Sequence, residues 1–332
     1  MSDKDILKDF PSLEDSLKAI ENLKKFEFPI YKKKKYPKKE DYINEVYSII
    51  EKEFKISPPN LLLPTKCKDF NFNLFRVREY STFTDINMFS EYSYPPINLT
   101  KMGRCNFPEK PVFYCSNNPI TSLFETIRDD NFENKMYCIS KWNVNKTEET
   151  LLFENYLRSE LPSDNEFKIF KELLDEKIEE TFKGELSQNK KKGLIKYLEF
   201  IDTKFIDDND YSVSSSIAYK SLFPPHNMGT DILMYPSKQT MQKGVNMAIN
   251  PNFVDIHMNA NRFYIIKVNR REQKNVLFEI SFINYGIVNN RKIMWNKIKD
   301  NDLTFENFII EDFGQSFYKT ITKNKNVLQH RV

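Results

Sequence analysis

The sequence contains little glycine, histidine or cysteine, and these shortages exclude several kinds of site. Among 332 residues it has 7 Gly, 3 His and 4 Cys, and no two cysteines form a Cys-x-x-Cys pair. A structural zinc site needs more such ligands at closer spacing, so we expect no metal. Because glycine is scarce, we expect Gly103, Gly229 and Gly244 to stand where the backbone needs a positive φ or a close approach.

Long apolar runs and a strong charge of either sign are also missing. No segment reaches the roughly 20 apolar residues that cross a bilayer, and the start of the chain lacks the apolar core of a signal peptide. Lys and Arg number 50 against 47 Asp and Glu, and this formal net charge of +3 argues against nucleic acid as a main partner. We therefore expect a cytoplasmic protein that binds no membrane.

Charged segments with helical periodicity occur in two parts of the chain. Residues 1–69 are expected to form a helical amino-terminal extension, with one helix from Ser12 to about Phe28 and a second over Lys39–Phe54. Residues from about 150 to 205 are expected to form a helical insertion. Its residues show no catalytic spacing, so we interpret it as scaffold or as a surface for a partner.

The most basic run of the sequence is YKKKKYPKK at positions 31–39, between the two helices of the extension. Lysines at this density suit contacts with phosphate or nucleic acid. A solvated linker of the same composition needs no partner. The sequence leaves both interpretations open, and nothing else in the extension supports nucleic acid.

The rest of the chain, 70–332, is expected to form one domain of strands and helices, which makes the fold class α+β. Alternating apolar residues predict strands in FRVREYS, YCISKWNV, RFYIIKVNRR and VLFEISFINYGIV, and PVFYCS and DILMY are predicted to be short buried strands. A helix is predicted over 120–127, with Glu125 outside its apolar stripe. The segment YSVSSSIAYKSLFPP is expected to pass from strand to helix.

Positions 103–125, GRCNFPEKPVFYCSNNPITSLFE, place an arginine, a tyrosine and a glutamate in one stretch. The guanidinium of Arg104 suits two-point binding of a phosphate. The ring of Tyr114 suits stacking on a cationic pyridinium. A carboxylate such as that of Glu125 stabilises the positive charge that develops on a ribose when its glycosidic bond breaks. These are the groups needed to cleave a nicotinamide dinucleotide.

The spacing of these residues resembles the RES domain, a family named for its Arg, Glu and Ser. RES domains carry a G-R-x-N segment, then a short apolar strand ending in Tyr, then a helix bearing Glu. Here Arg104 and Asn106 match the first segment. Tyr114 and Glu125 follow at the spacing of that pattern, ten positions from 104 to 114 and eleven from 114 to 125. One departure is Cys105, where the family usually has an aromatic residue.

Further segments match the same family. The arginine that opens the RES pattern, on an earlier strand, is similar to Arg76 in FRVR. A late P-S segment followed by Asn and then by N-P is matched by Ser237, Asn246 and the Asn-Pro pair at 250–251. The resemblance covers roughly 72–255, interrupted by the helical insertion.

The resemblance implies a fold like that of the mono-ADP-ribosyltransferases, a twisted mixed β-sheet in two halves with NAD between them. It implies a toxin of a bacterial toxin–antitoxin system, with NAD as its substrate and a cognate antitoxin as its protein partner. The implied reaction cleaves the nicotinamide–ribose bond by hydrolysis or phosphorolysis. The implied catalytic residues are Arg104, Tyr114 and Glu125, and the implied nucleotide-binding residues are Arg76, Asn106, Ser237 and Asn246.

Other interpretations remain open at this point. The acceptor of ADP-ribose is water, phosphate or a protein, and the last case would make the chain a mono-ADP-ribosyltransferase. A non-catalytic module could instead bind nucleic acid or protein through positions 31–39 and the helical insertion. The same residues also allow structural roles, namely a buried ion pair between Arg104 and Glu125, a core position for Tyr114 and a cap at Ser237.

Overall fold

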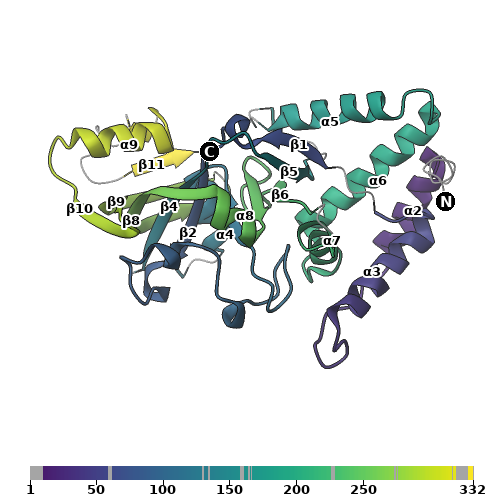
Figure 1. Ribbon diagram of the computed structural model, residues 1–332, viewed down its shortest axis with the longest axis horizontal. Helices are drawn as coiled ribbons and strands as arrows, with labels where there is room; N and C mark the ends of the chain where they lie inside the picture. Colours follow the sequence, from purple (N-terminus) through teal and green to yellow (C-terminus); the bar gives the residue numbers. More distant parts are fainter. Residues whose placement is uncertain are drawn as a thin grey trace. The chain divides into compact units, whose positions relative to one another are not determined.

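A computed structural model of the chain is mixed α+β, which confirms the predicted class (Figure 1). It describes residues 10–331 without 59–61, 129–130, 134, 158–160, 164, 166, 226–228, 273, 275, 316 and 319–327. The chain divides into two units whose segments alternate along the sequence. The first unit comprises Met1–Leu63, Ile97–Pro111 and Leu152–Pro236, and the second comprises Pro64–Pro96, Val112–Leu151 and Ser237–Val332.

Strands that pair side by side make up most of the second unit. Their order is β7 (Val245–Ile249), β3 (Phe113–Ser116), β2 (Leu74–Glu79), β4 (Met136–Val144), β8 (Met258–Glu272), β9 (Leu277–Asn289) and β10 (Lys292–Lys297), and β11 (Leu328–Arg331) also pairs with β9. All these neighbours run antiparallel. The strands predicted in FRVREYS, PVFYCS and YCISKWNV are confirmed as β2, β3 and β4. Most residues of β3 and β4 are buried, as in strands that are covered on both faces.

The helix predicted over 120–127 is confirmed as α4 (Pro119–Thr126). It begins at Asn118, whose side chain accepts a hydrogen bond from the backbone N–H of Thr121 at 2.8 Å. The apolar stripe of α4 is buried in one cluster with side chains of β2, β4, β8 and β9. This packing holds the helix that carries Glu125 against the sheet.

The sequence pattern does not predict two other helices of this unit, α8 (Pro251–His257) and α9 (Leu303–Phe313). A side chain caps each of them, because Asn250 and Asp302 accept hydrogen bonds from backbone N–H groups at 2.9 and 3.1 Å. The apolar residues of α9 are mostly aromatic or β-branched, which are typical of strands as much as of helices. Tertiary packing therefore decides the structure of this segment.

A buried ionic network attaches α9 to the sheet. The carboxylate of Asp312 accepts hydrogen bonds from Lys141 Nζ at 2.6 Å and from Arg262 Nη1 at 2.9 Å. The hydroxyl of Tyr264 donates to the second carboxylate oxygen. Burial, together with the nearby carboxylate, holds the pKa of Tyr264 above its usual value. One buried acid on a helix thus pairs with two cations on strands, and Arg262 also pairs with Glu311.

Helices make up most of the first unit as far as it is described. They are α2 (Leu13–Lys24), α3 (Lys39–Phe54), α5 (Lys168–Thr181), α6 (Gln188–Asp207) and α7 (Ser212–Leu222). Both helices predicted in the extension are confirmed, although the first ends at Lys24 rather than near Phe28. None of the helices among the described residues combines the length and the apolar character needed to span a bilayer.

The insertion expected to be helical over 150–205 begins with a strand, so this part of the prediction is wrong. Residues Thr150–Asn155 form β5, which pairs in parallel with β6 (Ile232–Pro236), and a further short strand is β1 (Leu63–Lys66). The apolar run in TLLFEN is too short to stand out from the charged residues around it. Its partner β6 lies far along the chain, where local periodicity gives no information about it.

The serine-rich segment expected to pass from strand to helix is helical throughout Ser212–Leu222. The hydroxyls of Ser215 and Ser216 donate to backbone carbonyls one turn earlier, the latter to Ser212 at 2.7 Å. Serine is a poor helix former in isolation because its hydroxyl competes for backbone groups. The other hydroxyls of this helix donate to groups outside it, as Ser212 does to Pro29 and Ser221 to Glu154.

A glycine lets the start of α2 approach α6 closely. A Cβ atom at Gly193 would collide with the backbone oxygens of Pro11 and Ser12. The hydroxyl of Ser16 donates to the carbonyl oxygen of Gly193 at 3.0 Å, which ties the two helices together. The predicted extension and the predicted insertion therefore belong to one packed unit.

Glu154 on β5 is a buried carboxylate surrounded by hydroxyl groups. The residue is 2% exposed and accepts hydrogen bonds from Tyr156 at 2.7 Å, Ser221 at 2.9 Å and Thr230 at 2.7 Å. Burial raises the pKa of Glu154 above its usual value, although the three hydroxyl donors act in the opposite direction. The folded state therefore favours the protonated form of this side chain.

Glu154→Gln is expected to make the free energy of unfolding less dependent on pH. Since folding raises the pKa of Glu154, its contribution to stability is complete below the unfolded-state pKa and is lost as the pH rises through the folded-state value. Denaturant unfolding of both proteins from pH 4.5 to 8 measures this. The variant should gain stability relative to wild type as the pH rises, and a constant difference across that range would contradict the assignment.

Candidate functional site

The Glu125 cluster consists of Glu125, Ser237, Asn246 and Ser116, which the second unit brings together from α4, β3, β7 and the segment before β7. One carboxylate oxygen of Glu125, Oε1, accepts hydrogen bonds from Ser237 Oγ and from Asn246 Nδ2, both at 2.7 Å. Ser116 Oγ donates to Asn246 Oδ1, also at 2.7 Å. The structure therefore joins three residues that the sequence analysis assigned to one site.

The turn that carries Ser237 is built closely against α4. A Cβ atom at Gly244 would collide with the hydroxyl of Thr121, which confirms the expected close approach of the backbone at this glycine. Ser237 donates its backbone N–H to Gly244 at 2.9 Å, and its Oγ accepts from the N–H of Thr240 at 3.3 Å. The side chain of Ser237 is thus a turn cap and a partner of Glu125 at once.

The two oxygens of the Glu125 carboxylate have different partners. Uncharged donors hold Oε1, and Oε2 lies 3.6 Å from Nη2 of Arg128, whose side chain is 57% exposed. These contacts hold the carboxylate in one orientation. It is suited to accept hydrogen bonds from ligand hydroxyls or to stabilise a positive charge that develops nearby.

The sequence analysis missed Ser116 and Arg128. Arg128 stands three positions after Glu125, just beyond the end of α4, and its Nη2 lies 3.6 Å from Glu125 Oε2. Ser116 has no local signal in the sequence. It meets Asn246 only because β3 and β7 pair with these two residues in register.

Arg76 and Tyr114 meet on neighbouring strands of the same unit. Nη1 of Arg76 donates to the backbone carbonyl of Tyr114 at 2.8 Å, and the guanidinium carbon lies 5.4 Å from the centre of the Phe113 ring. Burial of the guanidinium lowers the pKa of Arg76 to about 10. Arg76 therefore supports strand β3 directly, and Tyr114 is half-buried rather than enclosed in the core.

Arg104 and Asn106 belong to the first unit, on the segment Ile97–Pro111. Backbone hydrogen bonds join Gly103 and Asn106 in both directions, at 3.0 and 3.3 Å. The buried side chain of Asn106 donates to the carbonyl oxygens of Lys101 at 2.7 Å and Phe107 at 3.0 Å. Asn106 therefore shapes the loop that carries Arg104, and this amide nitrogen is occupied by the protein itself.

All four cysteines are buried thiols outside any disulfide, including Cys105 beside Arg104 and Cys115 beside Tyr114. Burial raises the pKa of the Cys115 thiol above its usual value. A thiol in this state is a poor nucleophile, because the thiolate is the reactive form. Cys105 and Cys115 are therefore buried residues with no sign of an activated thiol at Cys115.

The basic run at positions 31–39 forms an exposed turn in the first unit. Its two tyrosines pack with Tyr42 and Phe107, so aromatic rings anchor the turn. Lys33 forms an ion pair with Glu109 at 2.7 Å, and Lys35 lies 4.0 Å from Glu45. These acids offset part of the local charge, which favours the solvated interpretation over a phosphate contact.

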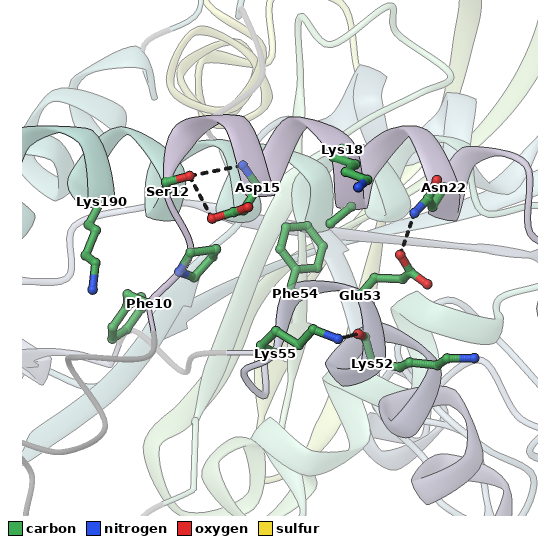
Figure 2. Close-up of a pocket in the computed structure, with 12 residues that line it drawn as sticks. Phe10, Ser12, Asp15, Lys18, Asn22, Lys52, Glu53, Phe54, Lys55 and Lys190 are labelled. Atoms are coloured by element: carbon green, nitrogen blue, oxygen red, sulfur yellow. Dashed lines mark hydrogen bonds between the residues drawn. The ribbon is translucent and has the colours of Figure 1, made fainter.

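A hollow of about 700 Å³ lies in the first unit, between α2, α3 and the start of α6 (Figure 2). Figure 2 shows α2 along one side, the carboxyl end of α3 on the other and Lys190 at one end. Its charged lining residues are Lys18, Lys52, Lys55, Lys190, Asp15 and Glu53. Both acids accept hydrogen bonds, from Ser12 and Asn22. None of the residues predicted to bind NAD lines this hollow.

No model of a known protein family matches the chain, and no curated protein matches it. The resemblance to RES domains thus rests on the motifs and on the positions of their residues.

Proposed function

We propose that the chain is an NAD-degrading enzyme of the RES type, which cleaves the bond between nicotinamide and ribose. The observation that carries this proposal is the Glu125 cluster. Ser237 and Asn246 stand 112 and 121 positions away from Glu125 in the sequence, yet both donate to the same carboxylate oxygen. Glu125 belongs to the central motif, and Ser237 and Asn246 belong to the late motif, so the two motifs that the RES resemblance assigns to NAD meet at one carboxylate oxygen.

The chemistry suits a carboxylate held in this manner. The bond from C1′ of the ribose to the ring nitrogen breaks, and neutral nicotinamide leaves with the bonding electron pair. Positive charge then develops on the ribose, and Glu125 would stabilise it while accepting hydrogen bonds from ribose hydroxyls. Water adds to C1′ and loses a proton, which completes hydrolysis. Inorganic phosphate in place of water would give the sugar phosphate.

The other predicted residues take complementary roles in this proposal. Arg104 would hold the phosphates, Tyr114 would pack on the nicotinamide ring, and Arg76 would fix strand β3 behind it. The antiparallel order of β7, β3, β2 and β4 around Glu125 supports an ADP-ribosyltransferase-like arrangement as part of the same proposal. Toxicity of the expressed protein, relieved by Glu125→Ala, would support the role as a toxin.

The test is release of nicotinamide from NAD by the purified chain, with and without inorganic phosphate. Arg104→Ala is expected to slow release about 10- to 100-fold, because a charged hydrogen bond to phosphate is lost. Arg270→Ala is the matched control, since that side chain is 56% exposed and pairs with Glu272. Equal rates for wild type and Arg104→Ala would show the assignment of Arg104 to be wrong. Transfer of labelled ADP-ribose to protein would indicate a transferase.

A further inference from the structure

Arg104 contacts the turn that joins α6 to α7, within the first unit. Its Nη1 donates to the carbonyl oxygen of Lys204 at 3.3 Å, and its guanidinium carbon lies 5.2 Å from the centre of the Tyr211 ring. Lys204 belongs to α6, and Tyr211 stands immediately before α7. The end of the predicted insertion and the turn after it thus reach the arginine that the resemblance assigns to phosphate.

The backbone of Tyr211 is left-handed, with φ 57° and ψ 25°. A bulky L-residue in this region costs about 1–2 kcal/mol, and glycine or asparagine is the usual occupant. Surrounding hydrogen bonds hold the turn in place. The carboxylate of Asp208 accepts from the N–H groups of Val213 at 2.8 Å and Ser214 at 3.0 Å, and Tyr211 O accepts from the N–H of Ser215 at 3.2 Å. A strained residue kept in this way is characteristic of functional sites.

The contact with the Tyr211 ring restricts the guanidinium of Arg104 without engaging its N–H groups. A guanidinium has five N–H groups, and the carbonyl of Lys204 takes one of them. A tyrosine ring within about 6 Å attracts the cation through its face, so it fixes the position of the group and leaves the N–H edge unoccupied. An arginine held in advance loses less entropy when it binds an anion.

We propose that Tyr211 is a positioning residue for Arg104, holding the guanidinium so that its remaining N–H groups bind the pyrophosphate of NAD. The identity of the ligand rests on the proposed function, whereas the contact between Tyr211 and Arg104 is seen in the structure itself. The α6–α7 turn then forms part of the anion-binding side of the site. The strained backbone of Tyr211 is the consequence of placing an aromatic ring where a glycine or asparagine would fold more easily.

Three variants separate positioning from folding. Tyr211→Phe keeps the ring, and Tyr211→Leu removes it while keeping an apolar side chain. Tyr211→Asn removes the ring and suits the left-handed backbone, so it is expected to fold even if Tyr211→Leu does not. The first measurement needs no NAD. Phenylglyoxal labels exposed guanidinium groups, and mass spectrometry follows the peptide containing Arg104, with exposed Arg270 as internal reference.

Labelling of Arg104 is expected to be several-fold faster in Tyr211→Leu and Tyr211→Asn than in wild type and Tyr211→Phe. Equal labelling in all four proteins would overturn the inference, whether or not the chain consumes NAD. The KM for NAD should rise about 2- to 30-fold in the two variants without the ring, with little change in kcat. Altered labelling in a protein that releases no nicotinamide would leave the contact established and the proposed function wrong.

Discussion

Glu125→Gln is expected to slow nicotinamide release about 100- to 1,000-fold and to leave the melting temperature unchanged. Glutamine keeps a carbonyl oxygen that can accept from Ser237 and Asn246, whose donors each lie 2.7 Å from Glu125 in the wild type. The variant loses only the negative charge, which is the property needed when positive charge develops on the ribose. Steady-state kcat and KM for NAD, measured beside thermal unfolding, separate these two effects.

Graded variants of the Glu125 cluster test the same assignment. Ser237→Ala and Asn246→Ala each remove one of two donors to Oε1 and should slow the reaction by about tenfold. Glu148→Gln, on a side chain of the same unit that is 77% exposed, should change nothing. Wild-type activity in Glu125→Gln would show that the carboxylate of Glu125 has no role in catalysis. Loss of folding in Glu125→Gln would show that the cluster is structural.

The parts of the fold that the sequence predicts well are those with a local signal. Strands β2, β3 and β4 are short segments rich in apolar and aromatic residues, and α3 begins and ends at the predicted residues, Lys39–Phe54. The strand β5 was missed because its pairing with β6 links Phe153 to Ile232, a contact that no local window contains. The helix α9 was not predicted because its segment is rich in aromatic and β-branched residues, which are as typical of strands as of helices. The capping residue Asp302 was a local signal for a helix start.

The residues of the candidate site also fall into those that the sequence predicts and those that depend on tertiary contacts. Motif order selected Glu125, Ser237 and Asn246, and these three residues do meet in the structure. The role expected for Asn106 depended on a side chain whose surroundings could not be read from the sequence. Its buried amide nitrogen donates to two backbone carbonyls, because a buried donor without a partner would be costly. Likewise, the ring of Tyr211 reaches Arg104 only through the turn between two helices.

Asp312→Ala is expected to lower the free energy of unfolding by about 3–5 kcal/mol, the largest effect on stability that the structure indicates. The side chain of Asp312 is 0% exposed, and that of Lys141 is 7% exposed. Removing the acid leaves the ammonium of Lys141 buried without its partner at 2.6 Å and takes from Arg262 its partner at 2.9 Å. Denaturant unfolding at pH 7 measures the loss.

Glu311→Ala is the matched control for Asp312→Ala, because the two acids are adjacent on α9 and both pair with Arg262. The side chain of Glu311 is 56% exposed, so water replaces it when it is removed and the cost should stay below about 1 kcal/mol. Both variants remove one negative charge and one partner of Arg262 from the same helix, but only Asp312 is buried and also bonds to Lys141 and Tyr264. If both variants lost equal stability, the charge on α9 rather than the buried network would be what attaches this helix to the sheet.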